Sequence, residues 1–438
     1  MPNASDAPAD PAGTRPVPAA EPAWPPGRRG CTAPQLAEEL AANAVDSLPR
    51  EALAEKLRTA HAEGRPLRVK LGIDPTAPDI HLGHAVVLGK LREFQDAGHR
   101  VVLIVGDYTA RVGDPSGRST LRPMLSAQEI DANAATFQEQ ALKILDPDPE
   151  RLEVRHNGEW LEMALSELLA LVRTTTVAQL LERDDFAKRW SAREPISMLE
   201  LLYPLLQGYD SVAVRADVEL GGTDQKFNLL LGRDIQRAYG QPEQAILTMP
   251  ILVGTDGRRK MSKSLGNQIG VTDAPGEMYG KTMSIPDEAM AEYYRLLLHQ
   301  EPLIGTQPDS EPDPQPAQLQ PREAKRALAR EIVAWLHSEA DAQKAEQEFD
   351  RVHIEHAAPE QIGEARFSVG QDGQVHLPGL IAEAFAMSRS EARRLIDQGG
   401  VALGEVQLQA GEHDVPAERA DGQVLKVGKR RFRRLRAG

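Results

Sequence analysis

Cysteine is almost absent from this sequence, and its absence sets the first limits on the chemistry. Cys31 is the only cysteine among 438 residues, which excludes a disulfide within the chain and a metal site built from several thiolates. The first thirty residues are rich in Ala and Pro and lack the apolar core of a signal sequence. We therefore expect a disordered tail over residues 1–33 and a cytoplasmic protein that does not use a membrane.

Basic residues are also fewer than acidic residues in this sequence. The formal net charge is -14, which argues against a protein that coats nucleic acid without selection but leaves local basic patches open. The length exceeds that of one ordinary domain, so two or three domains are expected.

Short apolar runs alternate with helical patterns through the first two thirds of the chain. This alternation predicts an α/β domain over residues 34–275, with a doubly wound parallel sheet of the Rossmann-like kind. Ligands bind such sheets beyond the carboxyl ends of the strands, where Gly72-Ile73-Asp74 and Gly221-Gly222 fall. The strands are expected at 67–73, 101–105, 152–154, 214–220 and 246–249, and the main helices at 82–97 and 223–239.

Helical patterns dominate after Gly276, with a proline-rich break. We expect an α-helical domain over residues 276–362, a surface loop over 302–321 and one long amphipathic helix from Pro321 to about Val352. A small α+β domain is expected over residues 370–438, where Ser388 and Glu391 form a capping box for a helix over 389–398.

Basic residues are concentrated in this last domain. They indicate an RNA-binding face, although an ordinary solvated basic tail is the alternative. The domain resembles a small RNA-binding domain found in a ribosomal protein and in pseudouridine synthases. The residues expected on its face are Arg389, Arg393, Arg394, Lys429, Arg430 and Arg431.

Two short strings far apart in the sequence predict one nucleotide site. His81-Leu82-Gly83-His84 opens a helix directly after a strand, where backbone amides and imidazoles meet a triphosphate. Lys260-Met261-Ser262-Lys263-Ser264 lies between glycines, and its two ammonium groups suit a pyrophosphate leaving group. Together they resemble the class I aminoacyl-tRNA synthetases.

Three polar side chains share one face of an expected helix. Tyr203, Gln207 and Asp210 are spaced i, i+4 and i+7, which suits an amino acid with an ammonium group and a polar tip. The alternative is that they bond neighbouring backbone. Here the chain is similar to the tyrosyl-tRNA synthetases of bacterial type, a resemblance that covers about Val69 to Leu265 and the C-terminal domain.

That resemblance implies the reaction and the residues that carry it. Tyrosine attacks the α-phosphorus of ATP, and the tyrosyl group then passes to tRNA(Tyr). Tyr203, Gln207 and Asp114 hold the α-amino group, Asp210 accepts from the phenolic hydroxyl, and Gln225 lies near the carboxylate. The expected ATP-binding residues are Gly72, Asp74, His81, Gly83, His84, Gly222, Asp224 and Lys263, and the expected catalytic residues are Thr76, His81, His84, Lys260, Lys263, Ser264, Arg118 and Arg122.

The partners implied are ATP with Mg²⁺, L-tyrosine, tRNA(Tyr) and a second copy of the chain. No protein-held metal is expected. One residue departs from the better-studied bacterial branch, because Lys70 replaces a tyrosine that helps Asp210 there.

Three other functions compete with this one. Tryptophanyl-tRNA synthetase shares the fold and both ATP motifs, but Gln207 and the basic domain disfavour it. A small-molecule nucleotidyltransferase would not need the RNA module. In a non-catalytic RNA-binding paralogue we would not expect both histidines and both lysines to be intact.

Overall fold

The structure is a computed structural model that describes residues 31–76, 78–115, 126–300, 320–354, 362–370, 373–404, 406–428 and 431–438. It divides into two compact units. The first contains the described residues up to Leu252 together with Lys260–Ser262, and the second contains Val253–Arg259 and the described residues from Lys263 onward. The lysine-rich string Lys260–Ser264 is thus divided between the two units. Each unit is described by itself.

A six-stranded sheet forms the centre of the first unit. Its strand order is β1-β6-β5-β2-β3-β4, and all neighbours are parallel except β1, which runs antiparallel to β6 at the edge. The chain adds β3 and β4 on one side of β2 and then β5 and β6 on the other, which confirms the doubly wound sheet. The bounds are β1 Asp46–Leu48, β2 Arg68–Ile73, β3 Arg100–Val105, β4 Leu152–His156, β5 Val218–Gly222 and β6 Ala245–Met249.

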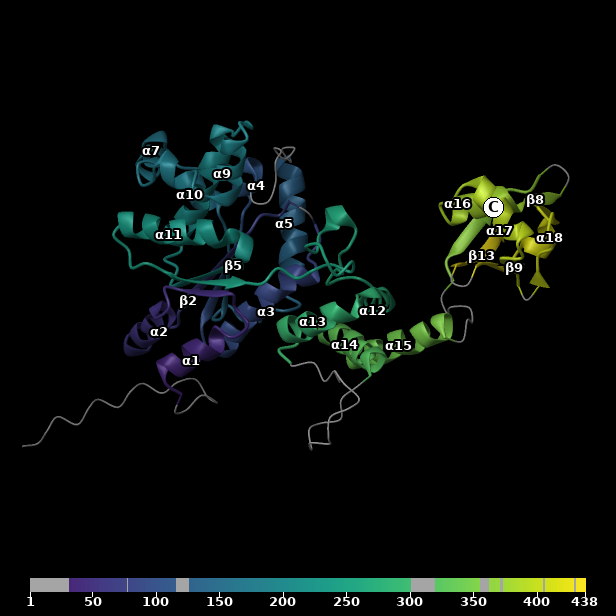
Figure 1. The fold of residues 1–438 in the computed structure, drawn as a ribbon, viewed down its shortest axis with the longest axis horizontal. Helices are drawn as coiled ribbons and strands as arrows, with labels where there is room; N and C mark the ends of the chain where they lie inside the picture. The colour runs from purple at the N-terminus through teal and green to yellow at the C-terminus, as the bar shows by residue number, and fades with distance from the viewer. Residues whose placement is uncertain are drawn as a thin grey trace, which may run out of the picture. The chain divides into compact units, whose positions relative to one another are not determined.

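Helices cover both faces of this sheet. Figure 1 shows α10 and α11 on one side of β2 and β5, and α2 and α3 on the other. The order in which successive strands are added reverses between β2 and β5, so ligands are expected at the carboxyl ends of these two parallel strands. The helices are α1 Ala33–Leu40, α2 Ala52–Ala62, α3 Leu82–Asp96, α4 Thr109–Val112, α5 Ala127–Ala141, α6 Gly158–Leu161, α7 Leu165–Val172, α8 Val177–Leu180, α9 Asp184–Ser191, α10 Met198–Ala213, η1 Thr223–Gln225 and α11 Lys226–Ala238.

The second unit contains helices followed by a small α+β module. The helices are η2 Lys263–Leu265, α12 Pro275–Ser284, η3 Asp287–Ala289, α13 Met290–Leu297, α14 Pro321–Leu336 and α15 Glu339–His353. The module has a five-stranded sheet of order β10-β9-β12-β13-β7 and a two-stranded sheet of β11 and β8. Its elements are β7 Glu364–Phe367, β8 Gln374–His376, α16 Leu377–Ala384, α17 Arg389–Asp397, β9 Val401–Leu403, β10 Val406–Gln407, β11 Asp414–Pro416, α18 Ala417–Ala420, β12 Val424–Val427 and β13 Arg431–Ala437.

Two element predictions were wrong. The strand expected from Val214 begins at Val218, because Val214 and Ala216 are buried in the turn after α10 and pack with core residues of β3. The single helix expected over 321–352 is two helices, because Ser338 caps a new one: its Oγ accepts a hydrogen bond from the Asp341 N–H. An apolar pattern does not separate a buried turn from a strand.

Other predictions are confirmed in part or lie outside the described residues. Ser388 caps α17 by accepting from the Glu391 N–H, which is one half of the predicted capping box. The proposed tail over 1–33 is described only from residue 31, and the loop over 302–321 only from residue 320. None of the described helices combines the length and the apolar character needed to cross a membrane.

Glycines allow α10 and α11 to approach each other closely. A Cβ atom added at Gly208 would lie 2.6 Å from Ile235 Cδ1 and 3.3 Å from the Cα of Gly232. Contacts this short force one helix or the buried Ile235 side chain to move. The pair of glycines therefore fixes how near α11 comes to the helix that carries Tyr203 and Asp210.

We expect Gly208→Ala to lower the free energy of unfolding by about 1–2 kcal/mol, because overpacking outweighs the gain in helix propensity. Gly280→Ala is the matched control on α12, where an added Cβ meets nothing within 4 Å. That control is expected to be neutral or stabilising by up to about 1 kcal/mol. Urea denaturation compares the two, and equal effects would contradict the close-packing argument.

Candidate functional site

Asp74 follows the last residue of β2 and is held by two hydroxyl groups. Thr109 Oγ1 donates to its Oδ1 at 2.6 Å, and Tyr203 Oη donates to its Oδ2 at 2.8 Å. Burial raises the pKa of Asp74 to about 7, and the nearby carboxylates of Asp114 and Asp210 add to the rise. Tyr203 and Asp74, predicted for different ligands, therefore lie in direct contact.

Asp210 is a buried acceptor in the same region. The residue is 3% exposed, Trp160 Nε1 donates to its Oδ1 at 2.8 Å, and Asn157 Nδ2 lies 3.4 Å from its Oδ2. Burial raises the pKa of Asp210 to about 6, and the positive charge of Lys70 opposes the rise. The Cβ position of Gly72 lies 4.0 Å from Asp210 Oδ2, so Gly72 borders this carboxylate.

A second network joins three more of the predicted residues. Asn228 Nδ2 donates to Gln207 Oε1 at 2.8 Å and to Gln225 Oε1 at 3.1 Å. Gln225 Nε2 in turn donates to Asp114 Oδ2 at 2.9 Å. Arg183, which is buried, bonds Asn228 Oδ1 at 3.2 Å. The residues predicted for an amino-acid ligand thus come together from α10, from η1 and from the segment after α4.

Besides Thr109, sequence reasoning missed four polar residues of these networks: Asn157, Trp160, Arg183 and Asn228. Asn157 also connects the two carboxylates, because its Nδ2 donates to Thr109 Oγ1 at 2.9 Å. None of the four belongs to a periodic pattern or a motif. The only available signal was that Asn157 and Trp160 directly follow β4 at the carboxyl edge of the sheet.

The two motif histidines lie at the start of α3 and form a stacked pair. Their ring centroids are 3.9 Å apart, and the His81 N–H donates to His84 Nδ1 at 3.3 Å. Burial lowers the pKa of His81 to about 4 and that of His84 well below its usual value, and Lys260 acts in the same direction. Both imidazoles are therefore neutral at pH 7.

Gly83 gives the pair its space. A Cβ atom there would lie 3.0 Å from two atoms of the His81 ring. His81 Nδ1 is buried and has no hydrogen-bond partner among the described residues, which is uncommon for a buried polar atom. Thr76 lies in the loop before α3, where its backbone N–H donates to the Asp74 carbonyl at 2.7 Å.

The first part of the lysine-rich string is attached to the first unit. Lys260 Nζ lies 2.7 Å from Asp224 Oδ2, and the buried Met261 donates its N–H to the Leu252 carbonyl at 3.0 Å. A Cβ atom at Gly222 would lie 2.6 Å from Asp224 Oδ1, so only glycine leaves this carboxylate its position. Lys263 and Ser264 begin η2 in the second unit.

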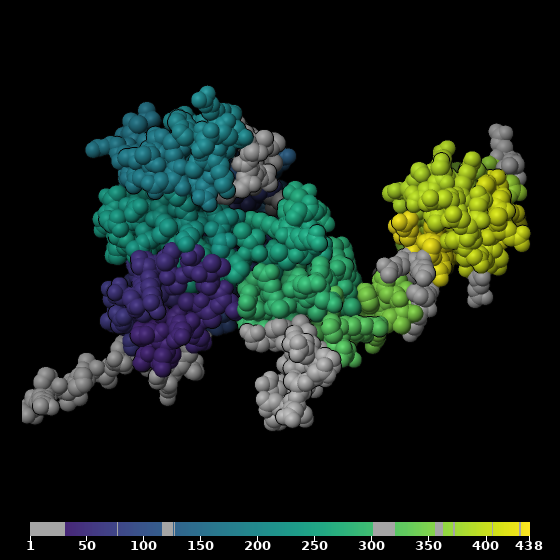
Figure 2. Space-filling view, in the orientation of Figure 1, coloured from purple at the N-terminus to yellow at the C-terminus, as the bar shows by residue number. Residues whose placement is uncertain are grey.

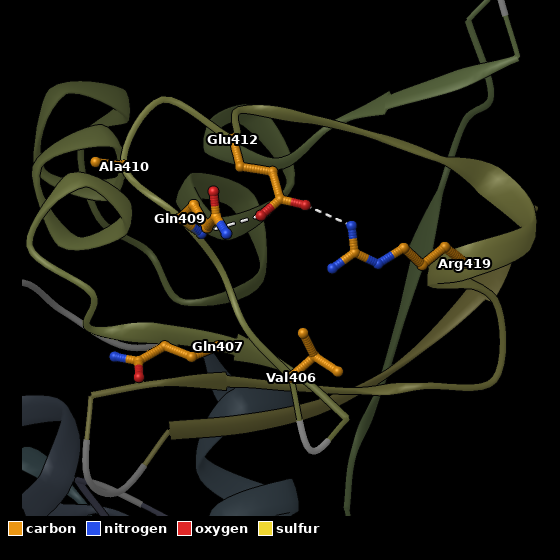
Figure 3. Close-up of a pocket in the computed structure, with 6 residues that line it drawn as sticks. All are labelled: Val406, Gln407, Gln409, Ala410, Glu412 and Arg419. Carbon is orange, nitrogen blue, oxygen red and sulfur yellow. Dashed lines mark hydrogen bonds and ion pairs between the residues drawn. The ribbon is translucent and has the colours of Figure 1, made fainter.

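The arginines predicted on the C-terminal module are exposed where they are described. These are Arg389, Arg393 and Arg394 on α17 and Arg431 on β13. Lys429, Arg430, Arg118 and Arg122 lie outside the described residues. Figure 3 shows a hollow of the same module in which Glu412 pairs with Arg419. None of the four described residues predicted to bind RNA lines it.

The described part of the chain contains no group of three or more His, Cys, Asp or Glu side chains that would hold a metal ion. The first unit instead offers buried acceptors, neutral imidazoles and the exposed ammonium group of Lys260. That combination suits a nucleotide beside a small zwitterion with a hydroxyl tip.

Comparison with known proteins gives a consistent result. Residues 62–353 match the family model described as tRNA synthetases class I (W and Y). The chain is 52% identical to a tyrosine–tRNA ligase of Moorella thermoacetica over 396 residues, covering 89% of this chain and 93% of that protein. It is 50% identical to that of Thermotoga maritima, covering 90% and 96%.

A solved structure gives the fold alone. The tyrosyl-tRNA synthetase of Archaeoglobus fulgidus complexed with L-tyrosine is 24% identical, with a TM-score of 0.56, and covers 72% of this chain and 100% of that one.

Asp74 makes the stability of the fold depend on pH. Its pKa is about 7 in the folded chain and about 4 in an unfolded one. The raised pKa means that the folded chain binds this proton more tightly than the unfolded chain does. The resulting contribution to the free energy of unfolding is complete below about pH 4 and is lost as the pH rises to 7. We expect Asp74→Asn to gain about 2 kcal/mol in unfolding free energy relative to wild type between pH 5 and pH 8. Urea denaturation at both pH values measures this, and a pH-independent difference would refute it.

Proposed function

The chain belongs to the family of class I tRNA synthetases for tryptophan and tyrosine, and on this premise we propose how its own residues activate tyrosine and pass it to tRNA. The activity is that of a tyrosine–tRNA ligase. In the first step the tyrosine carboxylate displaces pyrophosphate from ATP, and in the second a ribose hydroxyl of the tRNA end takes the tyrosyl group.

Asp210 is the observation that carries the choice of tyrosine. Its carboxylate is buried beyond the end of β2, with Trp160 and Asn157 bonded to its oxygens. A substrate hydroxyl would satisfy the acceptor capacity that remains, whereas a plain ring would leave it unpaired at a cost. Asp74 and Tyr203 would hold the ammonium group together with Gln207 and Asp114, and Gln225 would lie near the carboxylate.

Adenylate formation needs no covalent intermediate on the protein. The start of α3, with His81, Gly83 and His84, would bind the phosphates and the adenine, because free N–H groups and a neutral imidazole suit an anion there. Asp224 would bind the ribose, which requires Lys260 to leave it. The freed ammonium group, together with Lys263 and Ser264, would then meet the charge that grows on pyrophosphate.

Mg²⁺ would accompany ATP rather than occupy a protein cage. The described residues offer no cluster of metal ligands, so phosphate oxygens and water would supply most of the coordination. The metal would neutralise phosphate charge, while the protein residues position the nucleotide.

The C-terminal module would bind tRNA(Tyr). Exposed arginines of α17 and β13 support this, since phosphate contacts supply most of the affinity for RNA. We also propose the domain division given above, with a catalytic domain over 34–275, a helical domain over 276–362 and an RNA-binding domain over 370–438.

We propose a homodimer formed through α7 to α10. Large apolar side chains are exposed on these helices, which is unusual for a monomer surface. They are Leu165, Leu169, Val172, Val177, Trp190, Met198 and Leu199. Figure 2 draws this part of the first unit in blue to teal. Trp190→Glu should convert the dimer to a monomer in sedimentation velocity, and a wild-type monomer would contradict the proposal.

Amino-acid-dependent exchange of labelled pyrophosphate into ATP tests the function. We expect exchange with tyrosine and none above background with tryptophan, because the site offers a carboxylate for a phenolic hydroxyl. Exchange with tryptophan would favour tryptophanyl-tRNA synthetase. A protein that exchanges with neither amino acid would favour a non-catalytic RNA-binding role.

The same assay examines the lysine-rich string. Lys263→Ala is expected to slow adenylate formation far more than it weakens ATP binding, since its charge is needed mainly in the transition state. Equal single-turnover rates for variant and wild type would remove Lys263 from the mechanism.

A further inference from the structure

Lys70 is a lysine in the middle of the central strand of the sheet, and its side chain is fully buried. Its ammonium group meets three acceptors: the Gln207 carbonyl at 3.0 Å, Ser211 Oγ at 2.9 Å and Glu219 Oε1 at 2.7 Å. An ammonium group has three protons to donate, so every one of them has a partner. This residue does not belong to either ATP motif.

Glu219 completes the arrangement from the neighbouring strand. It pairs directly with Lys70 in the register of β2 and β5, and its side chain is 2% exposed. Its Oε2 accepts from Ser211 Oγ at 3.1 Å and also from Gln244 Nε2. Gly232 leaves room for the network, because a Cβ there would lie 2.9 Å from Gln244 Nε2.

Stability alone does not explain a buried ion pair. The desolvation of two charges offsets most of their attraction, and apolar side chains of equal volume often stabilise a fold as well or better. A pair that is retained and fully hydrogen-bonded is therefore better explained by what it positions. In this chain it is bonded to the one helix that carries the predicted selectivity residue.

The two residues of α10 that Lys70 contacts lie on either side of Asp210 in the sequence. Gln207 lies three residues before Asp210, and Ser211 directly follows it. Lys70 therefore holds the helical turn that points Asp210 at its site. Its charge is also the strongest influence that opposes the effect of burial on the pKa of Asp210, ahead of the two hydrogen bonds, and Glu219 acts more weakly in the other direction.

We propose that Lys70, held by Glu219, is a positioning residue for tyrosine selection: it fixes the turn of α10 and supplies positive charge behind Asp210 without touching the substrate. This inference rests on the proposed function, because it requires Asp210 to accept the substrate hydroxyl. It assigns a role to the position where the chain departs from the other bacterial branch.

Other titratable groups act on Asp210 and must be separated from Lys70. These are Glu219 on β5, Asp74 after β2 and Tyr203 on α10. Arg155 stacks on Trp160, a partner of Asp210, with 5.3 Å between its Cζ atom and the ring centroid. The pKa of Asp74, about 7, falls in the same pH range. A comparison of tyrosine with phenylalanine removes its contribution, since both substrates carry the same ammonium and carboxylate groups.

The test uses the full chain with Lys70→Met and Glu219→Gln combined, so that no unpaired charge stays buried. Steady-state pyrophosphate exchange gives kcat/KM for tyrosine and for phenylalanine between pH 5 and pH 9, and their ratio is plotted against pH. The acid limb of this ratio reports the free-enzyme pKa of Asp210. We expect it to move up by about one unit, which lowers the ratio about fivefold at pH 6 and leaves little change at pH 9.

Lys90→Met combined with Glu93→Gln is the matched control. It makes the same two substitutions at an ion pair on α3, where Lys90 is also fully buried. The control should leave the acid limb of the ratio where wild type has it. A shift of the same size in the control would overturn the proposal, because the effect would then follow from loss of any buried pair.

Two further outcomes are decisive. If the Lys70 and Glu219 double variant lowers the ratio equally at all pH values, or leaves it unchanged, Lys70 does not act on the charge of Asp210 and the inference fails. If wild type itself shows no tyrosine-dependent exchange, the proposed function fails first. Circular dichroism of each variant before the assay separates these results from misfolding. Ser211→Ala is a further variant that keeps both charges. It should leave the acid limb of the ratio close to that of wild type.

Discussion

Asp210 has to remain an acceptor in a place where the protein leaves it almost no water. Burial pushes a proton onto such a carboxylate, and the fold opposes this with two donated hydrogen bonds and a lysine behind the helix. Asp74 has only hydroxyl donors and neighbouring carboxylates, and its pKa rises further. The positive charge of Lys70 acts on Asp210, whereas the carboxylates of Asp114 and Asp210 act on Asp74. The proposed selection of a hydroxyl requires Asp210 to stay ionised.

The topology of the sheet explains why these groups can meet. Asp74 follows β2, Asn157 and Trp160 follow β4, and Gln225 lies in the turn after β5. The carboxyl ends of parallel strands lie along one edge, so residues distant in sequence reach a common space. α10 then crosses close above β2, because Gly208 and Gly232 let it pack tightly with α11.

Much of the fold was predictable because the strands of the first unit are short apolar runs, several of them ended by glycine or aspartate. The motif residues His81 and Lys260 were predictable for a related reason, since each lies in a compact string. Asn228 and Arg183 were not, because a hydrogen bond across 45 residues leaves no local pattern. Lys70 stood out only as a departure from relatives, and its partner Glu219 is 149 residues away. Ser338 did carry a local capping signal, which the apolar period beyond it concealed.

The nucleotide side of the site follows a different electrostatic rule from the amino-acid side. His81 and His84 are buried and neutral, whereas the charge lies on Lys260, which is 57% exposed and paired with Asp224. A cation raises the rate only if it interacts more strongly with the transition state than with bound ATP. In the proposed mechanism Lys260 leaves Asp224 and meets pyrophosphate as charge develops there. Under this proposal the charge that selects the substrate is fixed in the fold, whereas the charge that drives the reaction is on an exposed side chain.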